Sequence, residues 1–281
     1  MSLTADRVAI VTGAGRGIGQ VVAQRLAQLG WDVGLTARSA DELEVTAELV
    51  RSAGARELTM AGDVSKPGDV ERFCAAVEQG LGQPRLLVNN AAIAGEYGGV
   101  VGSDPDLWWQ VQEVNVRGPY LMCRRLAPAM IEHAAGYIIN INSLDCARAS
   151  AGGSPAYSVS KTALRRLTEA LAVDLEATGV VVFDLSPGLV RTAMGGSRPD
   201  AAQIAPEVWM PPSAAADKIE ALVSGRYDAL CGRFLHAKDD LDALLITVPG
   251  VADARMLRLL PADSTDTLFA YGALAGHRPA R

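Results

Sequence analysis

Short apolar runs alternate along the chain with segments in which apolar residues recur at helical spacing. The first run is residues 8–11, and residues 18–29 follow it, with Val22, Leu26 and Leu29 on one helical face before Gly30. Further runs that predict strands are residues 33–37, 58–61, 86–88, 137–141, 180–183 and 233–236. The segments that predict helices are residues 41–53, 67–81, 106–129 and 156–176. We therefore expect an α/β fold with a Rossmann-type, doubly wound parallel sheet and a ligand site at the carboxyl ends of its strands.

A glycine-rich turn joins the first predicted strand to the first predicted helix. Its sequence is Thr12-Gly13-Ala14-Gly15-Arg16-Gly17-Ile18-Gly19. Glycine lets the backbone approach a pyrophosphate closely, and the N-terminus of a helix favours negative charge. The same glycines could form an ordinary turn, but their place between a strand and a helix favours a dinucleotide-binding site.

A tyrosine and a lysine lie four residues apart in the predicted helix at 156–176. This spacing brings Tyr157 and Lys161 onto one helical face. An ammonium beside a phenol favours the phenolate, so we expect Lys161 to lower the pKa of Tyr157 from its usual ~10. Such a tyrosine can exchange a proton near neutral pH, as the interconversion of a carbonyl and an alcohol requires.

Taken together, these motifs resemble those of the short-chain dehydrogenases/reductases. The matches run in order from Arg7 to Thr192, and they are Thr12-Gly-x-x-x-Gly-x-Gly19, Asp63-Val64, Asn89-Asn90-Ala91, Asn115, Ser143, Tyr157-x-x-x-Lys161 and Pro187-Gly188. Two features depart from the family pattern. Ala92 replaces the usual glycine after Asn-Asn-Ala, and the C-terminal tail is longer.

The resemblance implies four catalytic residues. Tyr157 would be the general acid in reduction and the base in oxidation, and Lys161 would tune it and bind the nicotinamide ribose. Ser143 would donate to the substrate carbonyl oxygen, and Asn115 would complete a proton relay through a water near Lys161. Each also has a structural interpretation: a surface tyrosine and lysine, a capping serine, and an asparagine in helix packing.

Cofactor contacts are implied in the same way. They comprise the turn residues Thr12, Gly13, Gly15, Arg16, Gly17, Ile18 and Gly19, then Asp63, Val64 and Asn90 around the adenosine, Tyr157 and Lys161, and finally Pro187, Gly188, Val190 and Thr192 near the nicotinamide. Asp63 could instead be a turn aspartate, because it precedes a Ser-Lys-Pro-Gly sequence.

The end of the second predicted strand bears on the choice of cofactor. An acidic residue there would bind the ribose 2′-hydroxyl of NAD. The chain instead has Arg38 and no carboxylate before Asp41, and Arg16 in the glycine turn adds a second cation. We therefore expect NADP(H) to be preferred, with NAD(H) possible. Both arginines could instead be solvated at the surface. The alternative functions are an NAD-linked alcohol dehydrogenase and, less favoured, a non-catalytic nucleotide-binding regulatory protein.

The wall of the substrate pocket can be inferred only from the resemblance to the family. This wall would come from residues 95–97 and 144–146, Leu189 and a lid at 193–212 that carries Met194, Trp209 and Met210. A small, mainly apolar carbonyl or alcohol substrate fits this composition. Asp145 and Glu96 could add a polar contact or could be solvated. We expect Trp108 and Trp109 to be packing residues, and Pro119 to bend its helix.

Composition bears on partners and location. The net charge is −6 and no basic run occurs, so nucleic acid is not an expected partner. No apolar segment reaches membrane-spanning length, and the first strand begins so early that we expect no signal peptide. The four cysteines and three histidines show no metal-ligand spacing. We therefore expect a metal-free, cytoplasmic protein with reduced thiols.

The 281 residues fit one domain with an appendage. We assign residues 1–236 to the dinucleotide-binding domain, including the catalytic residues, and residues 237–281 to a C-terminal extension. A helix is predicted at 238–245, and the mixed apolar and basic segment at 252–260 could cover the substrate entrance, contact another subunit, or be a loosely docked terminus. Members of the family commonly assemble, so we expect a homodimer or homotetramer.

Overall fold

A computed structural model of the protein describes residues 7–147, 153–248 and 254–257. Within these residues seven parallel strands form one sheet in the order β3-β2-β1-β4-β5-β6-β7. The strands are β1 (Val8–Thr12), β2 (Asp32–Ala37), β3 (Glu57–Ala61), β4 (Pro84–Asn89), β5 (Gly136–Ile141), β6 (Val180–Ser186) and β7 (Phe234–His236). The strand order reverses direction at β1 and β4, which confirms the predicted doubly wound Rossmann-type sheet.

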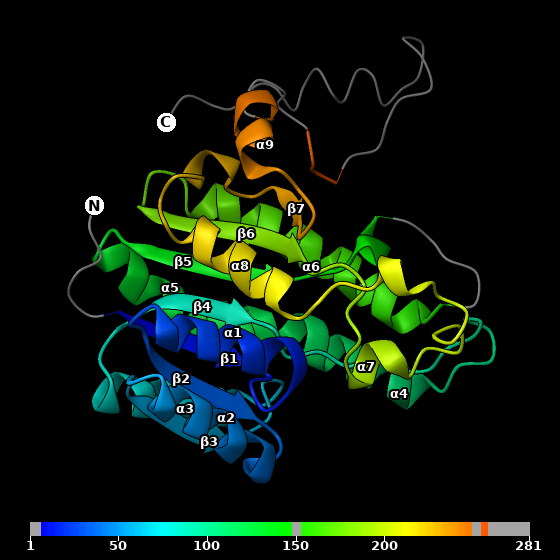
Figure 1. Ribbon diagram of the computed structural model, residues 1–281, viewed down its shortest axis with the longest axis horizontal. Coiled ribbons are helices and arrows are strands. Elements are labelled where there is room, and N and C mark those ends of the chain that lie inside the picture. Colours follow the sequence, from blue (N-terminus) through cyan, green and yellow to red (C-terminus); the bar gives the residue numbers. More distant parts are fainter. Residues whose placement is uncertain (1–6, 148–152, 249–253, 258–281) are drawn as a thin grey trace.

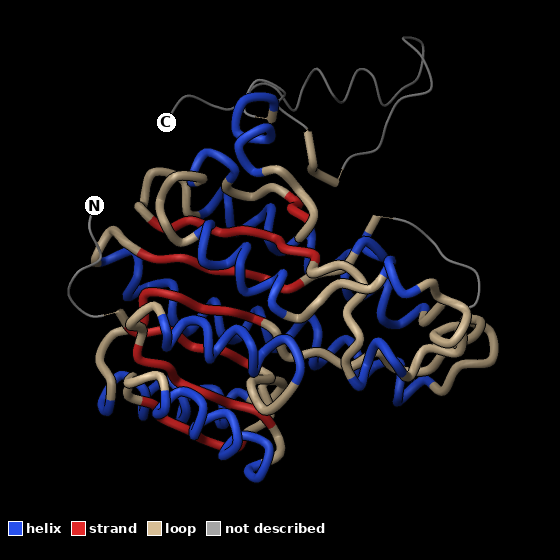
Figure 2. Tube along the Cα trace, viewed as in Figure 1, coloured by secondary structure: helices blue, strands red, loops and turns tan. Residues whose placement is uncertain are grey.

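Helices cover both faces of the sheet, as Figures 1 and 2 show. They are α1 (Gly17–Gln28), α2 (Ala40–Ser52), α3 (Pro67–Gly80), α4 (Pro105–Gln112), α5 (Gly118–Glu132), α6 (Pro155–Asp174), α7 (Ala193–Gly196), α8 (Ser213–Leu222) and α9 (Leu241–Thr247). Successive residues of a strand point to opposite faces. Accordingly, Ala9 and Val11 of β1 pack in one apolar cluster with α1, α2 and α8, whereas Val8 and Ile10 pack in a second with α3 and α5.

The predicted helix at 106–129 is interrupted in a way that the sequence pattern did not indicate. A π-helical turn, Glu113–Arg117, separates α4 from α5 and contains Asn115. Pro119 follows this turn in the first turn of α5, so it lies beside the interruption rather than bending a continuous helix. The prediction for Trp109 was wrong: its side chain is 60% exposed, and its ring stacks on Trp108 with the centroids 6.2 Å apart.

The beginning of the C-terminal extension is packed against the rest of the molecule. α9 begins at Leu241, three residues later than predicted, because Asp240 accepts hydrogen bonds from the next N–H groups as its N-cap. Leu241 and Val248 are buried in the same cluster as α1 and α8. Of the predicted segment at 252–260, residues 254–257 are described and the others lie outside the described residues.

The carboxyl ends of the strands point towards the part of the molecule that carries α4 and α7 (Figure 1). In a doubly wound sheet this edge is where ligands bind. No helix in the described part of the chain is both long enough and apolar enough to cross a membrane.

Candidate active site

The glycine turn after β1 is held in shape by the strand beside it. Gly13 and Gly17 have φ angles of 63° and 59°, in the left-handed region that side chains disfavour. Asn90, after β4, donates from Nδ2 to the carbonyls of Thr12 and Gly13 at 2.9 and 3.1 Å. The Thr12 hydroxyl accepts from the N–H of Asn90 at 3.0 Å. Thr12 and Asn90 therefore fix the turn so that the N-terminus of α1 faces the cleft.

A cleft of about 690 Å³ lies in front of this turn. The predicted cofactor residues in its lining are Gly13, Gly15, Arg16, Gly17, Ile18, Arg38, Asp63, Val64, Asn90, Tyr157, Lys161, Pro187 and Thr192. Gly188 and Val190 line the neighbouring cavity instead, whereas Thr12 and Gly19 line neither.

Close packing around the turn explains its glycines. A Cβ atom at Gly15 would lie 2.9 Å from the Cβ of Glu42, and one at Gly17 would lie 3.2 Å from Thr192. Only glycine leaves this backbone free, and the first N–H groups of α1 are donors suited to a pyrophosphate. The residues present therefore match the group that the motif implies.

The two arginines predicted to favour a 2′-phosphate differ in their surroundings. Arg38 lines the cleft and has no ion pair within the part of the chain that the structure describes. Arg16 is paired with Glu42 of α2, with Nη1 and Oε1 3.1 Å apart. Sequence inspection missed Glu42, because its proximity to Arg16 depends on how α2 packs across the turn. Arg38 is therefore the less neutralised of the two cations.

Asp63 combines both interpretations that its sequence allowed. Its Oδ1 accepts a hydrogen bond from the N–H of Ser65 at 2.9 Å, as a turn aspartate does. The residue also lines the cleft. Its turn role fixes it in place without removing it from the candidate adenine site.

The first turn of α6 places Tyr157. Ser154 is the N-cap, and its hydroxyl accepts from the N–H of Tyr157 at 3.4 Å and donates to the carbonyl of Ala94 at 2.5 Å. Lys161 lies one turn later, with Nζ 5.5 Å from the centroid of the Tyr157 ring and 2.7 Å from the carbonyl of Ile141. The predicted juxtaposition of tyrosine and lysine is therefore present in the fold.

The expected direction of the Tyr157 pKa shift was wrong. Burial raises the pKa of Tyr157 above its usual value, and the nearby carboxylate of Asp145 raises it further. A hydrogen bond with Ser143 acts in the opposite direction. Burial also lowers the pKa of Lys161, to about 8. Removal from water thus outweighs the pairing of phenol and ammonium on which the expectation relied.

The side chain of Asn115 is fully occupied by structural contacts. Its Oδ1 accepts from the N–H of Ile93 at 2.9 Å, and its Nδ2 donates to the carbonyl of Ile93 at 2.9 Å and to Ser160 Oγ at 3.0 Å. The residue lines neither cavity. Asn115 lies in the π-helical turn, and Pro119, four residues later, has no N–H to donate to its main-chain carbonyl.

A second cavity of about 530 Å³ meets the cofactor cleft at Tyr157, which lines both. Ser143 lines only the second cavity, and its hydroxyl accepts from the N–H of Asp145 at 3.2 Å. Members of the predicted wall found in its lining are Tyr97, Leu144, Asp145, Leu189, Met194 and Met210.

Two other predicted wall residues have different roles. Glu96 accepts a hydrogen bond from the N–H of Asp104, and Trp209 stacks under Arg191 at 4.7 Å. The predicted stretch 193–212 also contributes Arg198 and Asp200 to the lining, and these form a bidentate ion pair, with contacts of 2.9 and 3.0 Å, that the sequence did not indicate. The cavity is consequently more polar than its composition suggested. The described residues hold no group of three or more side chains suited to a metal ion.

A glycine turn facing a cleft of about 690 Å³, and a tyrosine–lysine pair where that cleft meets a second cavity, define a nicotinamide-dependent oxidoreductase. The chain belongs to the short-chain dehydrogenase/reductase family: the family profile described as short chain dehydrogenase matches residues 7–203.

Relatives in fungi are similar over much of the chain. A short chain dehydrogenase of Monascus purpureus is 34% identical over 85% of this chain and 83% of its own length. Another, from Pseudocercospora fijiensis, is 37% identical over 67% of this chain, and the match spans only 61% of that relative.

Two solved structures of nicotinamide-cofactor complexes are similar to this chain over most of its length. A variant of actinorhodin polyketide ketoreductase with NADPH is 29% identical, with a TM-score of 0.77 over 84% of this chain and 97% of its own. A metagenomic short-chain oxidoreductase in complex with NADP is 34% identical, with a TM-score of 0.68 over 79% of this chain and 92% of its own.

Proposed function

We propose that the protein is an NADP(H)-dependent oxidoreductase that interconverts a ketone or aldehyde with an alcohol on a small organic substrate. The observation that carries this proposal is the position of Tyr157, which lines both the cofactor cleft and the second cavity. Ser143 lies in the second cavity and Lys161 in the cleft, so the three side chains surround the boundary where hydride and proton transfer must meet.

The chain's own residues supply binding and proton chemistry. The glycine turn and the start of α1 would hold the pyrophosphate, and Thr192 and Pro187 would border the nicotinamide. The bound cofactor supplies or accepts a hydride. Ser143 donates a hydrogen bond to the substrate oxygen, where negative charge develops during reduction. Tyr157 then gives its proton to that oxygen.

The direction of the Tyr157 pKa shift favours reduction near neutral pH. A phenol whose pKa is raised holds its proton, so Tyr157 is ready to act as an acid. Lys161 stabilises the phenolate that forms and binds the nicotinamide ribose. By its resemblance to the family, Asn115 would complete a proton relay to this group through a water near Lys161. The cavity lining supports a substrate with an apolar body, contacting Leu189 and Met210, and a polar group near Asp145.

The preference for NADP(H) rests on Arg38. A cation without a carboxylate partner at the end of β2 can bind a 2′-phosphate with charge-assisted hydrogen bonds worth about 1.5–3 kcal/mol each. The NADPH and NADP in the two similar structures support the same choice. The pairing of Arg16 with Glu42 favours the second candidate, an NAD-linked alcohol dehydrogenase, because Glu42 lines the cleft and could accept from a ribose hydroxyl.

Calorimetric titration with both cofactors separates these candidates. NADPH should bind about ten- to a hundredfold more tightly than NADH, since about 1.4 kcal/mol is a factor of ten. The preference should weaken as salt is raised, because Arg38 is exposed. Arg38→Asp should reverse the preference, and Glu42→Gln is the matched control that should strengthen NADPH binding by releasing Arg16. Tighter binding of NADH to the wild type would support the NAD-linked enzyme.

A panel of ketones and alcohols, followed at the nicotinamide absorbance, tests the activity itself. We also infer that the enzyme works in the cytoplasm as a homodimer or homotetramer. Free cysteines suit a reducing compartment. Exposed apolar residues on α5 and α6, such as Tyr120 and Val173, are compatible with contact between copies. Light scattering gives the subunit count, and a monomer at all concentrations would exclude assembly.

A further inference from the structure

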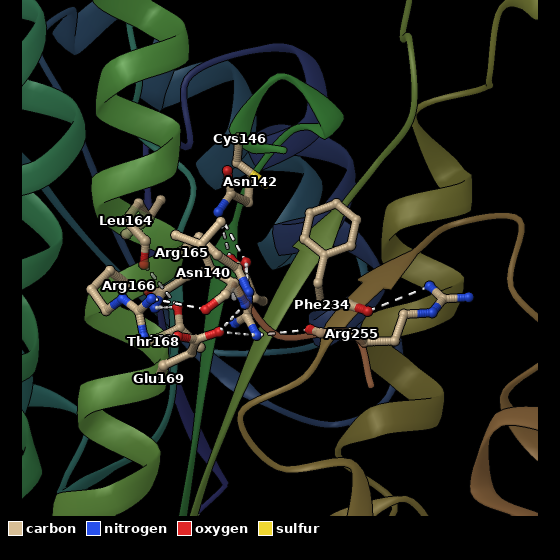
Figure 3. Close-up of polar contacts among 12 residues, drawn as sticks. Asn140, Asn142, Cys146, Leu164, Arg165, Arg166, Thr168, Glu169, Phe234 and Arg255 are labelled. Carbon is tan, nitrogen blue, oxygen red and sulfur yellow. Dashed lines mark hydrogen bonds and ion pairs between the residues drawn. The ribbon is translucent and has the colours of Figure 1, made fainter. Parts of the chain in front are cut away.

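A buried network of charged side chains lies directly behind Ser143 and Lys161. Arg165 of α6 is 2% exposed, Glu169 of α6 4% and Asp184 of β6 0%. Arg165 Nη2 lies 3.0 Å from Glu169 Oε1, and Arg165 Nε lies 3.6 Å from Asp184 Oδ2. Figure 3 shows Arg165 and Glu169 at the centre of these contacts. Removing charges from water is costly, so such a network is weak support for stability alone.

Asn142 connects the network to the active site. Its Nδ2 donates to Asp184 Oδ1 at 2.8 Å and to the carbonyl of Lys161 at 3.1 Å, and its Oδ1 accepts from the N–H of Ser143 at 2.8 Å. A carboxylate only accepts hydrogen bonds. The charged form of Asp184 therefore selects the amide orientation in which Asn142 Oδ1 faces Ser143.

We propose, on the basis of the function proposed above, that Asp184 is a positioning residue of the active site. It orients the Asn142 amide that fixes the turn carrying Ser143, and it places a buried negative charge beside the turn of α6 that carries Lys161.

Electrostatics support the second part of the proposal. Burial lowers the pKa of Lys161, and the negative charge of Asp184 is the largest influence opposing that effect. The groups that face Asp184 are Arg165, Lys161 and Glu169 on α6, with the thiol of Cys146 nearby. Burial is the largest influence on the pKa of Asp184 and, with Glu169, raises it to about 7 against the opposing effects of Arg165, Asn142 and Lys161. The charged form of Asp184 therefore predominates above about pH 7.

The described part of the C-terminal extension covers the far side of the network. Arg165 Nη2 donates to the carbonyls of Gly232 and Arg255 at 2.8 and 2.9 Å, and the N–H of Leu257 donates to Glu169 Oε1 at 2.6 Å. Figure 3 shows Arg255 on this side. These contacts help to exclude water, and in a low dielectric the charge of Asp184 acts more strongly on Lys161. Within the described residues, the extension reaches the second cavity only at Lys238 and lines no part of the cofactor cleft.

The charge state of Lys161 can be measured without a substrate. The chain contains only four lysines, Lys66, Lys161, Lys218 and Lys238. Carbon NMR of the full-length protein labelled at lysine Cε, titrated between about pH 6 and about pH 10, resolves them. The Lys161 resonance is assigned by its loss in Lys161→Arg. In Asp184→Asn its midpoint should fall by about one pH unit or more, because an opposite charge that favoured the ammonium is gone.

Two further variants separate this effect from a loss of stability. Asp184→Asn leaves Arg165 buried without its partner, so the double variant Asp184→Asn/Arg165→Met removes both charges and should recover thermal stability. Its Lys161 midpoint should remain low. Glu169→Gln is the matched control, because Glu169 is in the same network but is not among the groups that act directly on the pKa of Lys161. It should lower Tm and leave the midpoint in place. A wild-type midpoint in Asp184→Asn and in the double variant would overturn the proposal.

Activity provides an independent readout with any accepted ketone. Asp184→Asn should lower kcat about tenfold or more, the scale of a mispositioned acid, with a smaller change in KM. The alkaline limb of its pH–rate profile should move to lower pH. A kcat loss with an unmoved limb would overturn the electrostatic part. If the wild type is active but the Asp184 variants keep the wild-type Lys161 midpoint, the positioning role of Asp184 is rejected. The proposed oxidoreductase function would still stand.

Discussion

At the scale of single residues, the protonation of Tyr157 is set by its surroundings in the second cavity. Burial and Asp145 raise its pKa, whereas the hydrogen bond with Ser143 lowers it. The phenol is therefore a proton donor at neutral pH, and Lys161 is available to stabilise the phenolate once the proton has left. The same balance makes oxidation of an alcohol more demanding, because Tyr157 must first lose its proton.

Removing the Tyr157 hydroxyl tests the role directly. Tyr157→Phe keeps the ring and should lower turnover by about 10²- to 10⁴-fold, the usual contribution of a positioned acid or base. NADPH affinity, measured by calorimetry, should change little. Near-normal turnover on any accepted substrate would exclude Tyr157 as the proton donor.

Asp145 should shift the pH dependence of the reaction. Asp145→Asn removes a negative charge that raises the pKa of Tyr157, so the pKa should fall towards its ordinary value. In alcohol oxidation, where Tyr157 acts as a base, the rising limb of the pH–rate profile should move to lower pH.

Asp200→Asn is the matched control for Asp145. Asp200 lines the same cavity but acts on Tyr157 only through its partner Arg198, which has the smallest of the named influences on the Tyr157 pKa. Equal profiles for Asp145→Asn and the wild type would show that burial alone sets the Tyr157 pKa.

At the scale of elements, α6 organises the site. Its N-cap at Ser154 fixes Tyr157, its second turn carries Lys161, and its third and fourth turns carry Arg165 and Glu169. The π-helical turn before α5 packs against the same helix through Asn115 and Ser160. α6 thus packs against the sheet, the π turn and the C-terminal extension, and these contacts together fix where the candidate catalytic residues lie.

Truncating the extension should destabilise the protein. A chain ending at Ala237 loses Leu241 and Val248 from the main apolar cluster, and each buried aliphatic side chain contributes about 1.5–3 kcal/mol. It also loses the contacts that Arg165 and Glu169 make with residues 254–257. The free energy of unfolding in urea should fall by several kcal/mol, on the order of two such side chains.

A chain ending at Leu257 is the comparison that isolates residues 238–257. If both truncated chains have the stability of the full-length protein, the packing of α9 contributes nothing. NADPH affinity should be similar in all three, because the extension lines no part of the cofactor cleft among the described residues.

The sequence predicts those elements whose signals are local. Apolar runs gave the strands, and the glycine turn and the Tyr157–Lys161 spacing located the site, because strand alternation and helical periodicity act over a few residues. Contacts between distant residues could not be predicted. Glu42 meets Arg16, and Asp184 meets Asn142, only after helices and strands have packed. The expected direction of the Tyr157 pKa shift was wrong for the same reason, because the burial of a side chain is a property of the folded chain.

At the scale of the whole molecule, the two apolar clusters also fix the chemistry of the cysteines. Cys74 and Cys123 lie in the cluster on the α3 and α5 face, and Cys146 follows the turn at Ser143. Burial raises the pKa of each of these three thiols to about 12. These thiols are inert packing groups at neutral pH. They also make the free energy of unfolding depend on pH in the alkaline range.

The free energy of unfolding should therefore fall as pH rises above about 8. Unfolded thiols ionise near their ordinary pKa of about 8.5, whereas the native ones keep their protons until about pH 12. The unfolded state then binds fewer protons, so each thiol removes up to about 1.4 kcal/mol per pH unit. Burial also raises the pKa of Cys231, so this thiol acts in the same direction. Lys161, with its lowered pKa, acts in the opposite direction but as a single group against four thiols. Urea unfolding at about pH 8 and about pH 9 measures the slope before most unfolded tyrosines, whose ordinary pKa is about 10, ionise. The Cys74→Ala/Cys123→Ala variant should be less stable at the lower pH and yet show a smaller decline, because two of the four linked thiol protons are gone. An equal decline in both proteins would mean that the buried thiols are not its source.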